Sequence, residues 1–170
     1  EESKSIDSYV VGVGWLTNFG PFYFNGDVFI GQNGDQYQMT FQQGNDSAYF
    51  DPVTRDIIDN QQFGFSLVVG WKFNDMLKLE AGYGYLQNKL DRSNFTNNAG
   101  FTFNDPEDDM WSVYVQLPIT VSPGFTIIPE IAHFDWKDNE INPRAGTGTI
   151  DGVDDEGTTT YFGAVWRITF

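Results

Sequence analysis

The sequence of 170 residues is 17% aromatic and only 19% charged, and its net charge at pH 7 is -15. This charge argues against nucleic acid as a partner, because proteins that neutralise phosphates need clustered Lys and Arg, and the sequence has no such cluster. A mean hydropathy of -0.37 excludes a bundle of transmembrane helices, each of which needs about 20 predominantly apolar residues in succession. Without cysteine, neither a disulfide nor a thiolate metal site can be argued.

The N-terminal part of the chain is predicted to form a β-hairpin. Apolar residues occupy the odd positions of Tyr9–Trp15, and after Asn18–Pro21 they occupy even positions of Phe22–Ile30, against Asn25 and Asp27. One apolar face and one small or polar face per strand is the alternation of a barrel that has lipid outside and a lumen inside.

Residues 31–61 are predicted to form one long loop on the outer side. The competing interpretation places a strand at Gln36–Gln42 after an Asn33–Gly34 turn, but this segment is short for a span of about nine to eleven residues. Aromatic residues of this loop would let it fold into a pore and constrict it: Tyr37, Phe41, Tyr49 and Phe50.

The clearest alternation begins at Phe63. Odd positions from Phe63 to Phe73 are apolar, and the pattern resumes over Leu77–Tyr85 after the short turn Asn74–Met76. Two alternating segments joined by a tight turn predict a hairpin.

A further hairpin is predicted for Trp111–Val121 and Phe125–Ile131, around the turn Ser122–Gly124. Proline lacks the N–H that a sheet ladder needs, so we expect local bulges at Pro118 and Pro129. The last predicted strand is Thr158–Phe170, with its larger apolar residues on one face: Phe162, Ala164, Trp166, Ile168 and Phe170.

Together these segments predict an all-β protein, a transmembrane antiparallel up-and-down β-barrel. A soluble sandwich also alternates, but short turns here alternate with long acidic segments such as Asp105–Asp109 and Asp151–Gly157, which are predicted to be solvent loops. Aromatic residues placed towards strand ends, as an interfacial girdle requires, further favour the barrel: Trp15, Phe22, Phe73, Trp111, Trp166 and Phe170.

The segment Tyr161–Phe170 resembles the C-terminal strand of Gram-negative outer-membrane barrels, which ends in Phe after hydrophobic residues at alternate positions. The resemblance implies that the barrel-assembly machinery reads these residues as an assembly signal: Phe162, Trp166, Ile168 and Phe170. Further stretches resemble the C-terminal half of a porin family of delta-group proteobacteria: Gly20–Gly26 with Gly31–Asn33, Lys78–Tyr85, Val115–Thr120 with Pro123–Phe125, and Tyr161–Gly163.

This resemblance covers nearly the whole chain, although such porins are much longer. It implies a location in the outer membrane of a Gram-negative bacterium, in contact with lipid and lipopolysaccharide, and it suggests a homotrimer. If the last strand runs to the periplasmic face, counting back gives about seven strands and places Glu1 outside, whereas single-chain bacterial barrels have even strand numbers with both ends periplasmic. We therefore expect residues 1–170 to be one segment of a longer barrel, completed by upstream strands. The alternative is a complete eight-stranded barrel that includes Gln36–Gln42.

The predicted function is passive diffusion of small hydrophilic solutes or ions, with a mild preference for cations because the channel mouth is acidic. Charged side chains that face a lumen set ion selectivity, and both signs occur here, which predicts a transverse field. The candidate pore-lining residues are Asp27, Lys72, Lys78, Glu80, Glu130 and Arg167. The alternative is a plugged structural barrel or an adhesin that acts through its acidic loops.

An enzyme is not expected. A membrane-embedded hydrolase would need His133 oriented by a carboxylate such as Asp135, but the alternation places both on the outward face near the rim, where a solvated pair is the simpler interpretation. No cofactor is expected. The acidic segments offer oxygen ligands for loosely bound Ca²⁺ or Mg²⁺, yet Asp151–Glu156 lacks EF-hand spacing, and solubility of the loops is the simpler interpretation.

Overall fold

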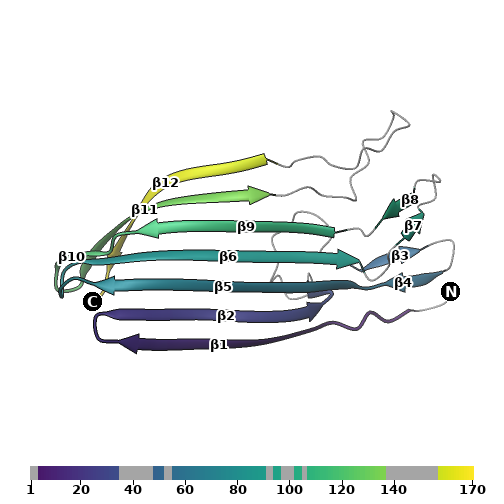
Figure 1. Ribbon diagram of the computed structural model, residues 1–170, viewed down its shortest axis with the longest axis horizontal. Helices are drawn as coiled ribbons and strands as arrows, with labels where there is room; N and C mark the ends of the chain where they lie inside the picture. Colours follow the sequence, from purple (N-terminus) through teal and green to yellow (C-terminus); the bar gives the residue numbers. More distant parts are fainter. Residues whose placement is uncertain are drawn as a thin grey trace.

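The computed structural model describes residues 4–34, 48–51, 55–90, 94–96, 102–104, 107–136 and 157–170. They form one eight-stranded antiparallel sheet and two small two-stranded sheets. The all-β, up-and-down arrangement predicted from the alternation is confirmed (Figure 1). The main sheet comprises β1 (Tyr9–Phe19), β2 (Phe22–Gln32), β5 (Asn60–Lys72), β6 (Lys78–Leu90), β9 (Glu107–Gln116), β10 (Ile119–Ser122), β11 (Phe125–Trp136) and β12 (Gly157–Ile168).

Short connections join the strands at one end of the sheet, called here the turn end. Gly20 and Gly124 adopt positive φ values of 59° and 80° in two of these turns, a conformation that glycine adopts without steric cost. In the third, Oδ1 of Asn74 accepts hydrogen bonds from the backbone N–H of Met76 at 2.8 Å and of Leu77 at 2.9 Å. The three predicted hairpins are therefore confirmed, each with local turn chemistry that explains it.

The opposite end, called here the loop end, carries the longer connections. The strands extend further in this direction than predicted, because β2 continues to Gln32 and β5 begins at Asn60. The single loop predicted for residues 31–61 is therefore wrong in detail: this interval also holds the small antiparallel pair of β3 (Tyr49–Asp51) and β4 (Asp56–Ile58). A second small pair, β7 (Asn94–Thr96) and β8 (Thr102–Asn104), lies between β6 and β9.

Part of the acidic segment predicted to be a solvent loop belongs to the sheet. Glu107, Asp108 and Asp109 start β9 and pair with Lys89, Asn88 and Gln87 of β6. Asp108 is buried. The prediction failed because a run of acids with proline resembles a loop locally, whereas pairing with β6 supplies the ladder partners that make it a strand. The segment at 151–156 lies outside the described residues.

The prolines interrupt the ladder at one point. Strands β9 and β10 pair with β11 in a single register, from Gln116 opposite Glu130 to Ile119 opposite Ile127, and are separated only by Leu117 and Pro118. The backbone N–H of Leu117 donates to the carbonyl of Pro129 at 3.0 Å, but Pro129 has no N–H to return. The main sheet therefore consists of seven antiparallel spans, as predicted. One of these spans, called here the broken arm, is divided into β9 and β10.

Neither proline forms the bulge that was expected. The arm is broken at Pro118, whereas β11 passes through Pro129 without a change of register against β12, where Pro129 lies opposite Ala164. The irregularity between β10 and β11 lies instead between Thr120 and Ser122. Because proline has no backbone N–H, it fits into a strand where its nitrogen is not required to donate to the ladder. Pro129 fits into β11 because it lies opposite Leu117, in the gap between β9 and β10.

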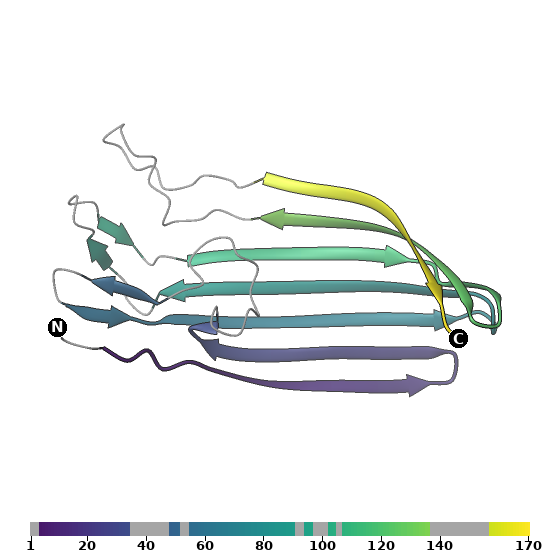
Figure 2. The same cartoon turned by 180° about the vertical axis from the view of Figure 1, so that it is seen from behind.

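Within the residues that the structure describes, the sheet is not closed into a barrel. Strands β1 and β12 lie at its two edges and do not pair with each other (Figures 1 and 2). The self-contained eight-stranded barrel, in which Tyr9–Trp15 would pair with Thr160–Phe170, is therefore not found. Its additional strand at Gln36–Gln42 lies outside the described residues, as do Tyr37 and Phe41 of the predicted constricting loop. Within the part of the chain that the structure describes, no helix is long and apolar enough to cross a membrane.

The described chain has very little hydrophobic core. Apart from the small strand pairs at the loop end, the sheet is a single layer (Figure 1). The large apolar side chains on one of its faces therefore remain exposed. The buried hydrophobic residues are Ile58, Leu90, Ile128 and Ala132, and they are matched by buried polar residues: Asn33, Asn60, Gln62, Asn88 and Asp108. A soluble sandwich would bury its apolar face under a second sheet, whereas most large apolar side chains of the main sheet are exposed among the described residues.

Candidate functional site

Strand register gives the main sheet a polar face, which carries all six predicted pore-lining residues. Asp27 is opposite Ser66, Lys72 is opposite Lys78, and Arg167 is opposite Thr126. Glu80, Gln116 and Glu130 form one row across β6, β9 and β11. Because side chains of directly opposed residues lie on the same face, the alternation predicted this shared face correctly. Their role in lining a pore stays a prediction.

Glu80 is the centre of a hydrogen-bonded group on this face, called here the Glu80 cluster. The hydroxyl of Tyr23 donates to Oε2 of Glu80 at 2.5 Å, and the hydroxyl of Tyr114 donates to Oε1 at 2.8 Å. The side-chain amide of Gln116 also donates to Oε1. Three donors from β2 and β9 hold this half-buried carboxylate in a single orientation on β6.

Glycine makes the Glu80 cluster geometrically possible. Gly70 lies between Tyr23 and Glu80 in the same row, and a Cβ there would lie 1.8 Å from Cζ of Tyr23. Gly82 lies opposite Tyr114, where a Cβ would lie 2.1 Å from the ring. Each tyrosine therefore lies flat across a glycine of the neighbouring strand, and Tyr23 reaches over β5 to β6.

Two further carboxylates on the polar face have hydroxyl partners. Asp27 accepts a hydrogen bond from the hydroxyl of Ser66, and Glu130 accepts one from the hydroxyl of Tyr161. These partners are neutral, and neither carboxylate forms an ion pair with another described residue. Among the described residues, the ion pairs join only Lys4 to Asp56 and Lys89 to Glu107.

The cations of the polar face are nearer the turn end than the carboxylates. Lys72 and Lys78 form the row next to Glu80, and Arg167 lies one row further towards the turns. Nζ of Lys72 lies 6.0 Å from the ring centroid of Tyr23. Charge of the two signs is therefore separated along the strands, whereas the sequence predicted a field across the lumen.

The other face, called here the apolar face, has aromatic rows at two levels. Near the turn end, Phe22 stacks on Trp71 with ring centroids 5.6 Å apart, and Trp71 contacts Phe73 at 4.2 Å. Towards the loop end, Tyr83 stacks on Trp111 at 6.2 Å, and the neighbouring rings belong to Phe63, Phe65 and Tyr85. Between the two levels, one row has aliphatic side chains over its four central strands, with Phe24 and Phe162 on either side of them: Val69, Ala81, Val115 and Ile131.

The predicted placement of aromatic residues towards strand ends is confirmed for some of them, and their role as an interfacial girdle stays a prediction. Phe22 and Phe73 belong to the turn-end group, and Trp111 belongs to the loop-end group. Trp15 and Trp111 instead lie within their strands, and the ring of Trp15 covers Gly26 of β2. Both were misplaced relative to the strand ends, because β1 continues to Phe19, four residues past its predicted end, and β9 begins at Glu107, four residues before its predicted start.

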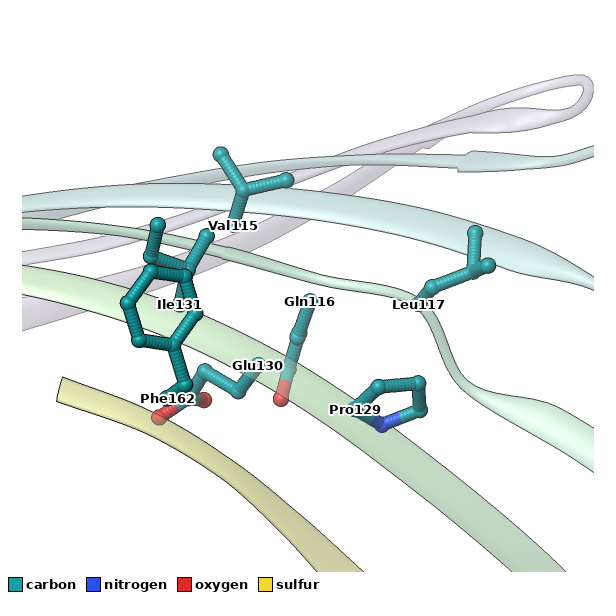
Figure 3. A pocket seen from close by; sticks show the side chains of 7 residues that line it. All are labelled: Val115, Gln116, Leu117, Pro129, Glu130, Ile131 and Phe162. Carbon is teal, nitrogen blue, oxygen red and sulfur yellow. The ribbon is translucent and has the colours of Figure 1, made fainter.

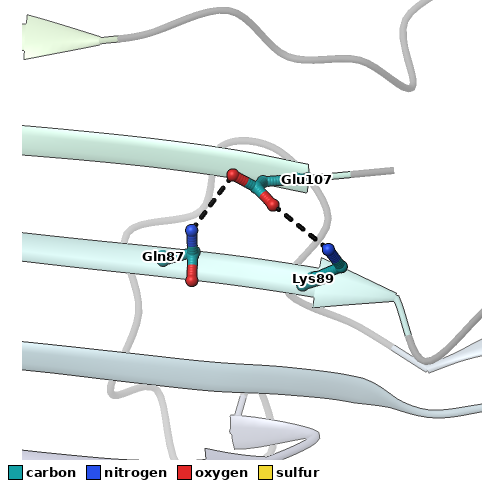
Figure 4. Close-up of polar contacts among 3 residues, drawn as sticks. All are labelled: Gln87, Lys89 and Glu107. Carbon is teal, nitrogen blue, oxygen red and sulfur yellow. Dashed lines mark hydrogen bonds and ion pairs between the residues drawn. The ribbon is translucent and has the colours of Figure 1, made fainter. Parts of the chain in front are cut away.

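Polar groups follow beyond the loop-end aromatic level of the apolar face. Nε2 of Gln87 donates to Glu107 at 3.0 Å, and Nζ of Lys89 lies 3.4 Å from the same carboxylate (Figure 4). Along β6 the outward side chains thus change from aliphatic at Leu79 and Ala81 to aromatic at Tyr83 and Tyr85, and then to polar.

The predicted assembly residues lie on or beyond the last strand. Phe162, Trp166 and Ile168 are exposed on the apolar face of β12, and Phe170 follows the strand. Phe162 also borders a cavity of about 280 Å³ beside the broken arm at Pro118. Val115 and Gln116 project to opposite sides of β9 there (Figure 3). Their recognition by an assembly machinery stays a prediction.

His133 and Asp135 lie on the apolar face near the loop end, where the alternation placed them. Nδ1 of His133 lies 2.7 Å from Oγ1 of Thr160, and its ring is 5.5 Å from that of Trp111. The imidazole is thus paired with a hydroxyl instead of being oriented by the Asp135 carboxylate. No group of three or more His, Cys, Asp or Glu within the described ranges is placed to hold a metal ion.

Sequence reasoning missed the tyrosines of the polar face. Tyr23, Tyr114 and Tyr161 were not candidate site residues, yet they donate to Glu80 and Glu130. For Tyr23 and Tyr114 a signal was present, since each lies opposite a glycine on the polar face. Recognising it required the register across several strands.

The chain was also compared with known proteins. No protein-family model matches the sequence, and no curated protein shows a significant match to it.

Proposed function

We propose that the main sheet is part of the wall of a porin-like channel in the outer membrane of a Gram-negative bacterium. One observation carries the proposal: the sheet exposes most of its large apolar side chains on one face and carries Asp27, Glu80 and Glu130 on the other. In water, an uncovered apolar face of this size would aggregate or bind a partner. In a bilayer, the same face would be solvated by lipid.

The order of side chains on the apolar face fits a bilayer. From Phe65 to Trp71, which mark the two aromatic levels, the strand rises by roughly 20 Å at about 3.4 Å per residue. Transmembrane barrels have an apolar band of about 25 Å between two aromatic girdles. The polar residues Gln87, Lys89 and Glu107 would then lie at the level of the lipid headgroups.

Closure of the wall requires strands beyond this sheet. The free edges of β1 and β12 leave backbone N–H and C=O groups without ladder partners, and each would cost several kcal/mol in hydrocarbon. Strands β1 and β12 run in the same direction, both towards the turn end (Figure 1). An all-antiparallel barrel therefore needs an odd number of further spans between them, supplied by another segment of the same barrel.

The polar face would line the lumen and favour cations. The carboxylates of Asp27, Glu80 and Glu130 have neutral hydroxyl or amide donors, so their charge remains available to the permeating ion. Lys72, Lys78 and Arg167 would lie near the periplasmic mouth, where water weakens their influence. We propose passive diffusion of small hydrophilic solutes and ions, with cations mildly preferred.

Planar-bilayer recording of the intact protein tests this proposal. We expect stable conductance steps and a reversal potential in a KCl gradient that shows preference for K⁺. The double variant Glu80→Gln and Glu130→Gln should reduce this preference, because two lumen charges are lost. Asp135→Asn on the apolar face is the matched control and should leave selectivity unchanged.

Other outcomes would favour different functions. A protein that inserts but never conducts would contradict the channel and favour a plugged structural barrel or an adhesin. Hydrolysis of lipid or peptide that disappears in His133→Ala would favour a membrane enzyme. Equal reversal potentials for the Glu variants and the wild type would contradict the assignment of the polar face to the lumen.

A further inference from the structure

A second cavity lies on the apolar face at its loop end, and it has no role in the channel proposed above. It has a volume of about 310 Å³ and spans four neighbouring strands, β1, β2, β5 and β6. Outward side chains border it, and the backbone of Gly31 and Gln62 contributes to its floor. The bordering side chains belong to Tyr9, Ile30, Gln61, Phe63, Gln87 and Lys89.

The register divides these side chains into two rows. Gln61 lies opposite Lys89, and Tyr9 lies in the same row through Gln32. Ile30, Phe63 and Gln87 lie in the next row towards the aromatic level, with Phe63 between the other two. The cavity is therefore polar on the side of the loops and mainly apolar on the side of the lipid band, as a site for the neck and headgroup of an amphiphile would be.

The polar groups are those that recognise hydroxyls. The amide of Gln61 offers donors and an acceptor, and Gln87 keeps its carbonyl oxygen and the second N–H of the amide group that donates to Glu107. The hydroxyl of Tyr9 can donate or accept, which matches a sugar hydroxyl. The exposed rings of Tyr9 and Phe63 offer apolar surface for the C–H face of a sugar.

The negative charge around this cavity disfavours an anionic headgroup. Lys89 is the cation of the cavity, and it is already paired with Glu107 at 3.4 Å (Figure 4). Asp109 lies in the next row beside Gln87, and the chain as a whole carries a net charge of -15. A phosphate would therefore meet a neutralised lysine in a negative field, whereas an uncharged headgroup would meet donors and acceptors at no electrostatic cost.

We propose that this cavity binds the uncharged, hydroxyl-rich headgroup of a glycolipid, with the acyl chains lying over Ile30 and Phe63. The inference rests on the proposed function in one respect, namely that the apolar face lies in the bilayer. Gln61 and Gln87 are the residues that contact the headgroup, and Tyr9 closes the cavity at the sheet edge.

The test uses the full chain in lauryldimethylamine oxide micelles, which contain no sugar. Dodecyl maltoside is titrated in, and the side-chain amide resonances of the glutamines are followed by NMR. We expect saturable shifts at Gln61 and Gln87, and an affinity about tenfold lower in the double variant Gln61→Ala and Gln87→Ala, as the loss of two net hydrogen bonds implies. Thr17→Ala, on the same face near the turn end, is the control and should bind as the wild type does.

Two results would overturn the inference. Equal shifts with dodecylphosphoglycerol would show that the site does not select an uncharged sugar, and shifts that persist in the double variant would place the ligand elsewhere. Failure of the channel proposal is detected separately, because the conductance of the double variant in planar bilayers should equal that of the wild type whether or not maltoside binds.

Discussion

The two faces of the main sheet are made from neighbouring residues of the same strands, yet they are stabilised in opposite ways. On the polar face, specific hydrogen bonds link strands that are not adjacent, as Tyr23 of β2 reaches Glu80 of β6. On the apolar face, rings and aliphatic side chains lie side by side without a covering layer. The polar face therefore depends on particular partners, whereas the apolar face depends on its surroundings. Substitutions at adjacent positions should separate these two dependences.

The largest expected difference comes from an arginine placed on either face of β5. Val69 is exposed on the apolar face, and Val68 is its neighbour on the polar face. In the proposed bilayer, Val69→Arg should lower the free energy of unfolding by about 2–4 kcal/mol, the cost of arginine near the middle of a lipid-facing strand. Val68→Arg should cost at least about 1 kcal/mol less, because its charge can reach lumen water.

The measurement is reversible urea unfolding of the intact protein from phospholipid vesicles, followed by tryptophan fluorescence. If both arginine variants lost the same free energy of unfolding, the two faces would not differ in their surroundings. This result would contradict the assignment of the apolar face to the membrane.

A smaller effect is expected where a glycine accommodates a tyrosine. Gly70→Ala would place a Cβ 1.8 Å from Tyr23 and force the ring away from Glu80. We expect a loss of about 1–3 kcal/mol in the free energy of unfolding, typical of overpacking. Gly14→Ala is the control on the same face, since the nearest atom to its Cβ would be 3.7 Å away.

The same unfolding measurement applies to this pair. If Gly14→Ala is as destabilising as Gly70→Ala, the loss reflects strand glycines in general, and the close approach of Tyr23 would not be its cause.

The smallest effect is expected from single hydroxyl groups. Tyr23→Phe removes one of three donors to Glu80 while Tyr114 and Gln116 remain, so we expect a loss of about 1 kcal/mol. Tyr83→Phe on the apolar face should change stability by less than about 0.5 kcal/mol. A double-mutant cycle of Tyr23→Phe with Glu80→Gln should show coupling between the two residues. Additive losses would contradict the hydrogen bond.

Much of the sheet could be predicted because its signals are local. The alternation around Phe63–Phe73 predicts a strand and assigns each side chain to a face, and Pro123 with Gly124 specifies a turn. The bounds at the loop end could not be predicted in this way. Glu107–Asp109 resembles a loop until β6 provides its partners, and Asn33 ends β2 through contacts with residues distant in sequence.

Asn33 shows why such contacts escape sequence reasoning. Its side chain donates to the backbone carbonyl of Asp7 and to the carboxylate of Asp59, each at 2.8 Å. Its Oδ1 accepts from the backbone N–H of Asn60 at 2.9 Å. These partners come from the segment before β1 and from the start of β5. They reach Asn33 only because the loop-end termini of β1, β2 and β5 lie next to one another.

The sequence by itself determined the strand periodicity, the turns and the face on which the six candidate lumen residues lie, because a strand repeats every two residues and a turn depends on a few adjacent ones. Only the tertiary structure decided which side chains meet. Tyr23 and Glu80 are 57 positions apart and lie on strands separated by β5. Their contact follows from two successive registers and from a glycine between them, and a change in either register would move every partner to another row or to the other face.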